Sequence, residues 1–369
     1  MRDPKPHLTL HSKSLTEDLN KNISLTVWQD DHNHRLVMCI PIAFINEATS
    51  KPIKWLTYVC RAIVGMPGYV SSQPCNTDNP SEISADAALS EGGEYYYVAG
   101  HNCLPTEKIL LWAYSLSLME PKFRSRSLTG FQDFLKRRDG ACVFTGLGMV
   151  RSHHFVPGRS EDYRDWKSLV CRGIDFGPDD IRNGLTVSLV VHDLIREGVA
   201  GILCKTNDIL SDADIPSPRT CLCVRDIVYK NNLVSPCIQP PEIKGIQSIA
   251  DGPPPQYILQ YFTRFVSQRL SLEYEVGVPH NTRADFLDLQ LLPDPSRCLP
   301  DPRICEYSYG GLVLLNFIDS EHTTPWTEIC ARAHKLNPDF SVEHCPTYSK
   351  KAQVMEYLSF FSHCKLWTV

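Results

Sequence analysis

The chain has 369 residues, of which 43% are hydrophobic, and a formal net charge of −5. This is enough apolar material for one large domain or two ordinary ones, and it excludes an intrinsically disordered chain. The acidic balance excludes the global positive field of a dedicated nucleic-acid binder, so any contact with a polyanion must be local.

Cysteine usage and the first residues point to the cell interior. The 15 cysteines are scattered singly through apolar stretches, which is typical of buried thiols in a reducing compartment. Residues 1–6 carry charges and prolines where a signal peptide has an apolar run, and no stretch has the roughly 18 apolar residues of a membrane helix. We therefore expect a cytoplasmic, intracellular protein without membrane contact.

The first third of the chain, residues 1–120, is predicted to be rich in strands. Residues 23–28 and 35–41 hold β-branched and aromatic residues on either side of a polar turn, which predicts a β-hairpin. The tyrosine-rich residues 94–100 form another candidate strand, whereas residues 109–118 fit a helix or a strand equally well.

One helix is also predicted in this part. Residues 54–64 have apolar side chains at helical spacing and are followed by Gly65, a common helix end.

The central part alternates short helices and strands. A helix is predicted for residues 131–138 and strands for residues 142–145 and 153–157. After an Asn-Gly turn, residues 185–187 are a further candidate strand, followed by a helix that ends near Glu197. The resulting order is strand, loop, strand and helix.

The last part, residues 206–369, is predicted to be a linker followed by helices. A segment rich in proline and glycine precedes residues 255–270, whose apolar residues lie on one face of a predicted helix. A last helix is predicted for residues 351–364, and residues 271–350 carry no clear signal.

A zinc site at Cys221, Cys223 and Cys237 is not expected. The one-residue gap between the first two cysteines suits a chelating turn poorly, and no fourth ligand has a standard spacing.

Four polar residues of the central part are the strongest functional signal. His153 and His154 are adjacent, Asn183 follows after a loop, and His192 comes nine residues later. Histidines at the end of a strand and the start of a helix can gather around one divalent ion, for which phosphodiester hydrolysis is the typical chemistry. Because neighbouring strand residues point to opposite sides, His153 and His154 are expected to have different roles.

These residues lie in stretches that resemble the HNH (ββα-metal) nuclease domain of fungal proteins, and the resemblance covers residues 131–205. The doubled histidine and the nine-residue step are similar to those of colicin DNases. The stretches that carry the resemblance are 139–146, 153–157, 183–185 and 192–198.

The resemblance implies a role for each of the four residues. His154 would be the general base, His153 and His192 would be metal ligands, and Asn183 would brace the loop against the base. The family also has Asp or His four residues after His192, where this chain has Arg196.

Arg196 argues against a metal. A guanidinium about 4 Å from a divalent ion costs on the order of 8 kcal/mol at an effective dielectric constant near 20, and arginine does not lose its proton. Asp193 and Glu197 do not replace the missing ligand. Asp193 lies about 100° round the helix from His192, and Glu197 lies about 100° round the helix from Arg196. We therefore expect no metal and no cofactor.

Arg196 has two interpretations. It is either a salt-bridge partner of Asp193 or Asp180, or an anion-binding group beside His154. In the second case the pair suits a carboxylate, an enolate or a phenolate. Residues 121–172 also hold eleven Lys or Arg against five Asp or Glu, which fits a phosphate groove but more often marks a solvated face.

The sequence thus predicts a mixed α+β protein. Its central HNH-like ββα unit spans residues 121–205, between a strand-rich N-terminal part, 1–120, and a helical C-terminal part, 206–369.

The leading functional hypothesis is an HNH-fold protein that is no longer a nuclease. His154, Asn183 and Arg196 would carry out general acid–base chemistry on a small organic molecule, held by Arg196, His153 and His192. A cyclase or isomerase step in fungal secondary metabolism fits this reading, which rests on analogy.

Two alternatives remain open. The first is a metal-dependent endonuclease in which His153 and His192 hold Mg²⁺ or Zn²⁺ and the partner is DNA. The second is a non-catalytic scaffold with a fossil site. The sequence does not indicate the substrate or the oligomeric state.

Overall fold

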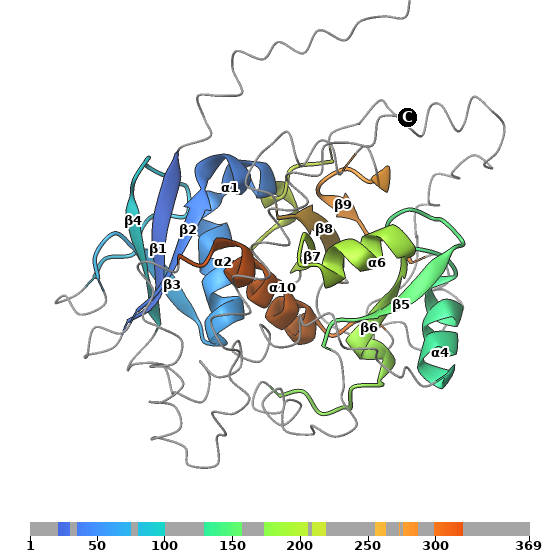
Figure 1. The fold of residues 1–369 in the computed structure, drawn as a ribbon. Helices are drawn as coiled ribbons and strands as arrows, with labels where there is room; N and C mark the ends of the chain where they lie inside the picture. The colour runs from blue at the N-terminus through green and yellow to red at the C-terminus, as the bar shows by residue number, and fades with distance from the viewer. Residues whose placement is uncertain are drawn as a thin grey trace, which may run out of the picture.

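The described residues form three sheets and five helices (Figure 1), which confirms a mixed α+β fold. The computed structural model describes residues 21–29, 35–74, 80–99, 129–156, 173–205, 209–218, 255–262, 273, 276–286 and 299–319. The predictions that lie outside these residues are the segments 109–118 and 351–364 and the three cysteines Cys221, Cys223 and Cys237.

The N-terminal sheet has four strands in the order β2-β1-β4-β3. β1 (Asn22–Gln29) and β2 (Arg35–Pro41) form the predicted antiparallel hairpin, and β4 (Glu94–Ala99) is the predicted tyrosine-rich strand. β4 pairs in parallel with β1 and antiparallel with β3 (Gly68–Ser71).

Two helices follow this hairpin, α1 (Ile42–Ala48) and α2 (Pro52–Val64). α2 confirms the helix predicted for residues 54–64. Proline suits its first turn, where the backbone N–H has no helical partner, and Gly65 ends it with a φ of 74° in the left-handed region.

A second sheet joins strands from distant parts of the chain in the order β7-β8-β9. They are β7 (Ala200–Lys205), β8 (Gln256–Tyr261) and β9 (Thr282–Arg283). The helix predicted for residues 255–270 is therefore wrong over β8. Its residues are almost all buried, including the polar Gln260, so polar and apolar residues do not alternate along it, and periodicity does not distinguish such a short strand from a helix.

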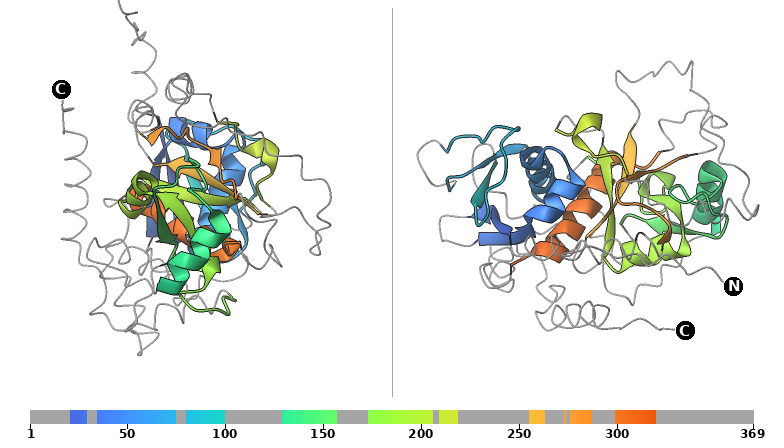
Figure 2. Two further views of the ribbon diagram at one scale, coloured as in Figure 1. Left: turned by 90° about the vertical axis from the view of Figure 1, so that its right-hand side faces the viewer. Right: turned by 90° about the horizontal axis from the view of Figure 1, so that it is seen from above.

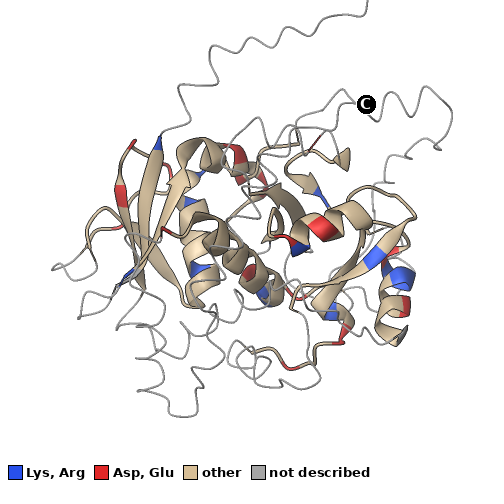
Figure 3. Ribbon diagram, viewed as in Figure 1, with Lys and Arg blue, Asp and Glu red and all other residues tan. Residues whose placement is uncertain are grey.

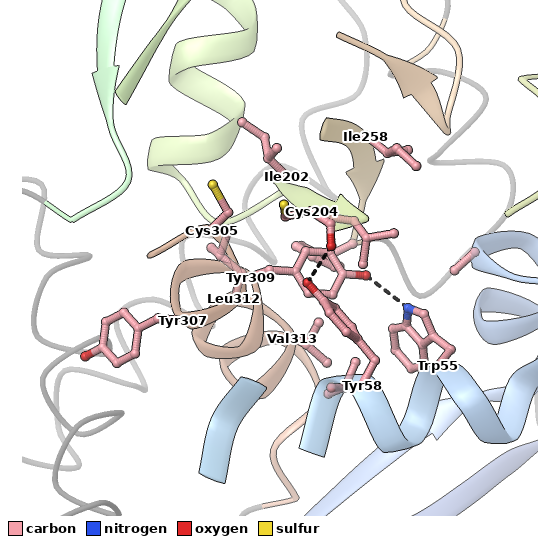
Figure 4. Packing of buried hydrophobic residues seen from close by; sticks show 14 of the residues in the cluster. Trp55, Tyr58, Ile202, Cys204, Ile258, Cys305, Tyr307, Tyr309, Leu312 and Val313 are labelled. Atoms are coloured by element: carbon pink, nitrogen blue, oxygen red, sulfur yellow. Dashed lines mark hydrogen bonds between the residues drawn. The ribbon is translucent and has the colours of Figure 1, made fainter. Parts of the chain in front are cut away.

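Helix α10 (Pro302–Phe317) lies between the N-terminal helices and the central part (Figure 2). Gly310 permits its close approach to α2, because a Cβ there would lie 2.9 Å from the Cβ of Ala62. Two buried hydrogen bonds join α2 to its neighbours (Figure 4): Trp55 donates to the Tyr309 hydroxyl (3.1 Å), and Tyr58 donates to the Cys204 carbonyl (3.3 Å).

The central part contains a two-stranded antiparallel sheet followed directly by a helix. The strands are β5 (Val150–His154) and β6 (Gly184–Ser188), and the helix is α6 (Leu189–Arg196). Helix α4 (Thr129–Asp139) precedes β5, and the 3-10 helix η2 (Ile181–Asn183) leads into β6.

The helices predicted for residues 131–138 and up to Glu197 and the strand predicted for residues 185–187 are confirmed. The strand predicted for residues 153–157 lies earlier, at Val150–His154, and Phe155 and Val156 are outside it. The strand predicted for residues 142–145 is wrong, because these residues form a turn in which Gly146 N donates to Cys142 O (2.8 Å). The predicted Asn-Gly turn is also wrong, because Gly184 is extended (φ −166°) and begins β6.

The C-terminal part is not only helical, since β8 and β9 belong to it. β8 also pairs with β7 across the boundary expected near residue 205. A single cluster of buried hydrophobic residues extends from β1 to α10. None of the described helices could span a membrane.

A buried ion pair ends helix α4. Arg138 and Asp139 are each 1% exposed, and their side chains form a bidentate pair (2.5 and 3.0 Å). Arg138 also donates to the carbonyls of Ile181 (3.0 Å) and Gly184 (2.8 Å), and Asp139 accepts from Thr186 N (2.6 Å). The pair therefore fastens the end of α4 to η2 and β6.

We predict that Arg138→Met lowers the free energy of unfolding by about 3–5 kcal/mol, because it leaves the Asp139 carboxylate buried without its counter-ion. Urea denaturation measures the change. The matched control is Arg137→Met, at an exposed position one residue earlier, which should change stability by less than about 0.5 kcal/mol. Equal effects of the two substitutions would contradict this role.

Candidate functional site

The predicted site residues gather where β5 ends and α6 begins. Residues alternate between the two faces of β5, so Arg151 and His153 share one face and Ser152 and His154 share the other. Helix α6 covers the first face, where His192 meets His153, and α4 covers the second. The two adjacent histidines thus have different surroundings, as expected.

His153 and His192 are in direct contact. Their ring centroids lie 5.6 Å apart and the rings are nearly perpendicular (83°). Burial, with smaller effects from His192 and His154, lowers the pKa of His153 to about 3. With this lowered pKa, the imidazole of His153 is neutral at neutral pH.

His154 is held by a stacked aromatic ring. The ring of Phe131, from α4, lies 3.9 Å from the His154 ring between centroids and is nearly parallel to it (13°). Burial, with a smaller effect from His192, lowers the pKa of His154 to about 4. Its Nε2 lies 3.9 Å from Asp179 Oδ1, and because the ring is neutral at neutral pH this contact is dipolar rather than an ion pair.

Gly184 makes room for this stack. A Cβ at this position would lie 2.7 Å from Cζ of Phe131 and 2.5 Å from the His153 carbonyl oxygen. Only glycine therefore lets α4 place Phe131 on the His154 ring.

Asn183 is fully buried and braces the chain that follows His154. Its Oδ1 accepts from Val156 N (3.1 Å), and its Nδ2 donates to the carbonyls of Val156 and Pro178 (both 2.7 Å). This geometry agrees with the role that the resemblance implies for Asn183.

Arg196 points to carboxylates of its own helix. Its guanidinium lies 3.4 Å from Asp193 and 2.8 Å from Glu197, and the side chain is 49% exposed. Asp180, the other partner considered, is paired with Arg182 instead (2.9 Å). The structure places Arg196 as a salt-bridge partner, which was the first of its two interpretations.

His192 lies between opposing charges. Burial is the largest cause that lowers its pKa, Asp193 at 3.4 Å raises it, and Arg151 and Arg196 lower it further. Two guanidinium groups therefore act on the same imidazole.

The donor set at this point fits a metal poorly. His153 and His192 supply two imidazoles, but within the described part of the chain no group of three or more His, Cys, Asp or Glu could hold a metal ion. Protein sites for Zn²⁺ have at least three protein ligands.

Three parts of the site were not identified in the sequence. Phe131 was predicted only as the first residue of a helix, Gly184 only as part of a turn, and Arg138 only as the last residue of that helix. In the sequence, the only local sign of the Arg138–Asp139 pair is that the two residues are adjacent and precede a glycine. This pattern does not indicate that the pair is buried.

Comparison with known proteins finds no matching family model, no similar curated protein and no matching solved structure. The resemblance to HNH nucleases thus stays a prediction, and the geometry is the evidence for what the site does.

We predict that Gly184→Ala displaces Phe131 and raises the pKa of His154 from about 4 toward its ordinary value of 6.5. Histidine ring signals followed by NMR during a pH titration measure the shift. The control is Gly177→Ala, because nothing lies within 4 Å of a Cβ there. An unchanged His154 titration in Gly184→Ala would show that the stack does not set its pKa.

We also predict that acid destabilises the protein through these histidines. The pKa values of His153 and His154 are lower in the folded chain than the ordinary 6.5, so the unfolded chain takes up protons first. Stability is complete above pH 6.5 and falls with decreasing pH by about 1.4 kcal/mol per unit for each histidine. Urea denaturation between about pH 6 and 5 measures the slope of the free energy of unfolding against pH. In His154→Gln this slope should be smaller than in the wild type by about 1.4 kcal/mol per pH unit.

Proposed function

We propose that this chain is a metal-degenerate HNH-fold protein in which His154 performs general acid–base chemistry on a small organic molecule. The observation that carries the proposal is the state of His154, which is neutral at neutral pH and is held in one orientation by Phe131. A neutral, oriented imidazole is ready to accept a proton.

The electrostatics of the site favour an anionic substrate. Arg151 and Arg196 both lower the pKa of His192, and an anionic group bound near this imidazole would interact favourably with their positive charge. An imidazole with a pKa near 4 is a weak base, but a bound anion beside it raises that pKa by stabilising the imidazolium. Substrate binding would thus strengthen the base that acts on it.

The reaction class follows from this arrangement. His154 takes a proton from a C–H or O–H of the substrate, and the resulting imidazolium returns a proton at another atom. Asn183 keeps the chain after His154 in place. No electrons are gained or lost overall, which is the balance of a cyclisation or an isomerisation.

The test uses protein treated with a chelator. Wild-type protein and His154→Ala are incubated with a small-molecule extract of the source organism, and mass spectrometry compares the compounds consumed and formed. We expect a conversion that persists without metal and disappears in His154→Ala. Absence of any difference between the two proteins would overturn the proposal and favour a non-catalytic scaffold.

The alternative function is a metal-dependent endonuclease, which the contact between His153 and His192 favours. Plasmid nicking that requires Mg²⁺ or Mn²⁺ and is lost in His154→Ala would support it. Arg196→Asp restores the ligand type of the HNH pattern and should raise Zn²⁺ affinity in calorimetry, with Arg196→Gln as the control for loss of charge alone. No gain in Arg196→Asp would contradict the idea that Arg196 excludes the metal.

A further inference from the structure

We propose that a buried water molecule binds between the hydroxyl groups of Ser152 and Thr186, on the face of the β5–β6 pair that α4 covers. The ligand of this site is a small neutral molecule that both donates and accepts hydrogen bonds. The site goes beyond the proposed function, because it requires neither a substrate nor a proton transfer at His154.

The pairing of the two strands brings these hydroxyls together. Ser152 of β5 lies directly opposite Thr186 of β6. The backbone N–H of Thr186 donates to Asp139 (2.6 Å) and its carbonyl accepts from Val143 N (3.1 Å), so neither group is used for the ladder with β5. The two residues are therefore a non-hydrogen-bonded pair of an antiparallel ladder, in which opposite side chains share one face and lie close together.

Both hydroxyl groups are buried and lack a bonding partner. Neither Ser152 Oγ nor Thr186 Oγ1 has a hydrogen bond within the part of the chain that the structure describes, and Thr186 is fully buried. Hydroxyls at opposite positions of two strands can bond each other directly, but these two do not. Buried polar groups in native proteins are nearly always satisfied by the protein or by ordered water, because leaving them unbonded is costly.

One water molecule satisfies both hydroxyls at once. The Cβ atoms of residues that are directly opposite across two strands lie roughly 4.5–5.5 Å apart. This separation leaves room for a water that bridges the two oxygens. A buried water typically has about two to four polar partners, and the two hydroxyls supply two of them.

The surroundings favour water over an ion. β6 has no Lys, Arg, Asp or Glu, and the only one in β5, Arg151, is on the opposite face from Ser152 (Figure 3). The carboxylate that reaches β6, that of Asp139, is already paired with Arg138. Two neutral hydroxyls do not compensate the cost of removing an ion from bulk water, so the ligand is neutral.

The experiment measures urea denaturation of the full chain in the wild type, Ser152→Ala, Thr186→Val and the double variant. Thr49→Val is the matched control, because Thr49 is equally buried and its hydroxyl donates directly to the Asp214 carbonyl (2.8 Å). We expect each of the three single substitutions to raise the unfolding equilibrium constant by roughly two- to tenfold, as for the loss of one hydrogen bond. The double variant should change it by less than the product of the Ser152→Ala and Thr186→Val effects, since the water leaves when it loses either partner.

Two results of this experiment overturn the proposal. One is a Thr186→Val variant that is more stable than the wild type, because removal of a dry, unbonded hydroxyl is favourable. The other is a double variant whose effect equals the product of the two single effects.

A crystal structure of the wild-type chain gives a second readout that does not depend on variants. Electron density for one water within about 3.2 Å of both hydroxyl oxygens supports the site. A direct hydrogen bond between Ser152 and Thr186, or no density between them, overturns it.

Discussion

The buried pair of Arg138 and Asp139 is the interaction on which the rest of the site depends. Burying two charges is costly unless hydrogen bonds satisfy them, and here backbone groups of η2 and β6 do so. The carbonyl of Ile181 and the N–H of Thr186 belong to the segment that carries Asn183. The pair therefore sets the position of that segment relative to α4, although neither charged residue touches the histidines.

The same fastening explains the state of His154. Once the end of α4 is fixed on β6, its first turn brings Phe131 over Gly184 and onto the imidazole. The stack removes water from the ring and lowers its pKa, while Asn183 holds the chain that follows. The attachment of α4 to β6 thus contributes both to the stability of the fold and to the low pKa of His154.

The distribution of charge gives the two faces of β5 different characters. On the α6 side, the imidazoles of His153 and His192 are in contact, and Arg196 is paired with Asp193 and Glu197. On the α4 side, His154 lies against the ring of Phe131, and the nearby charge is the carboxylate of Asp179 (3.9 Å).

Local signals in the sequence determined the β1–β2 hairpin, α2, α4 and the strand–helix order that places His192 near His153, because turns, helix ends and periodicity act over a few residues. They did not distinguish β8 from a helix, since a strand buried on both faces has no alternating pattern. The partners of Arg196, the space at Gly184 and the burial of Arg138 depend on contacts between distant segments. Only the tertiary structure decided these, because burial and charge pairing arise from packing and not from the residue types alone.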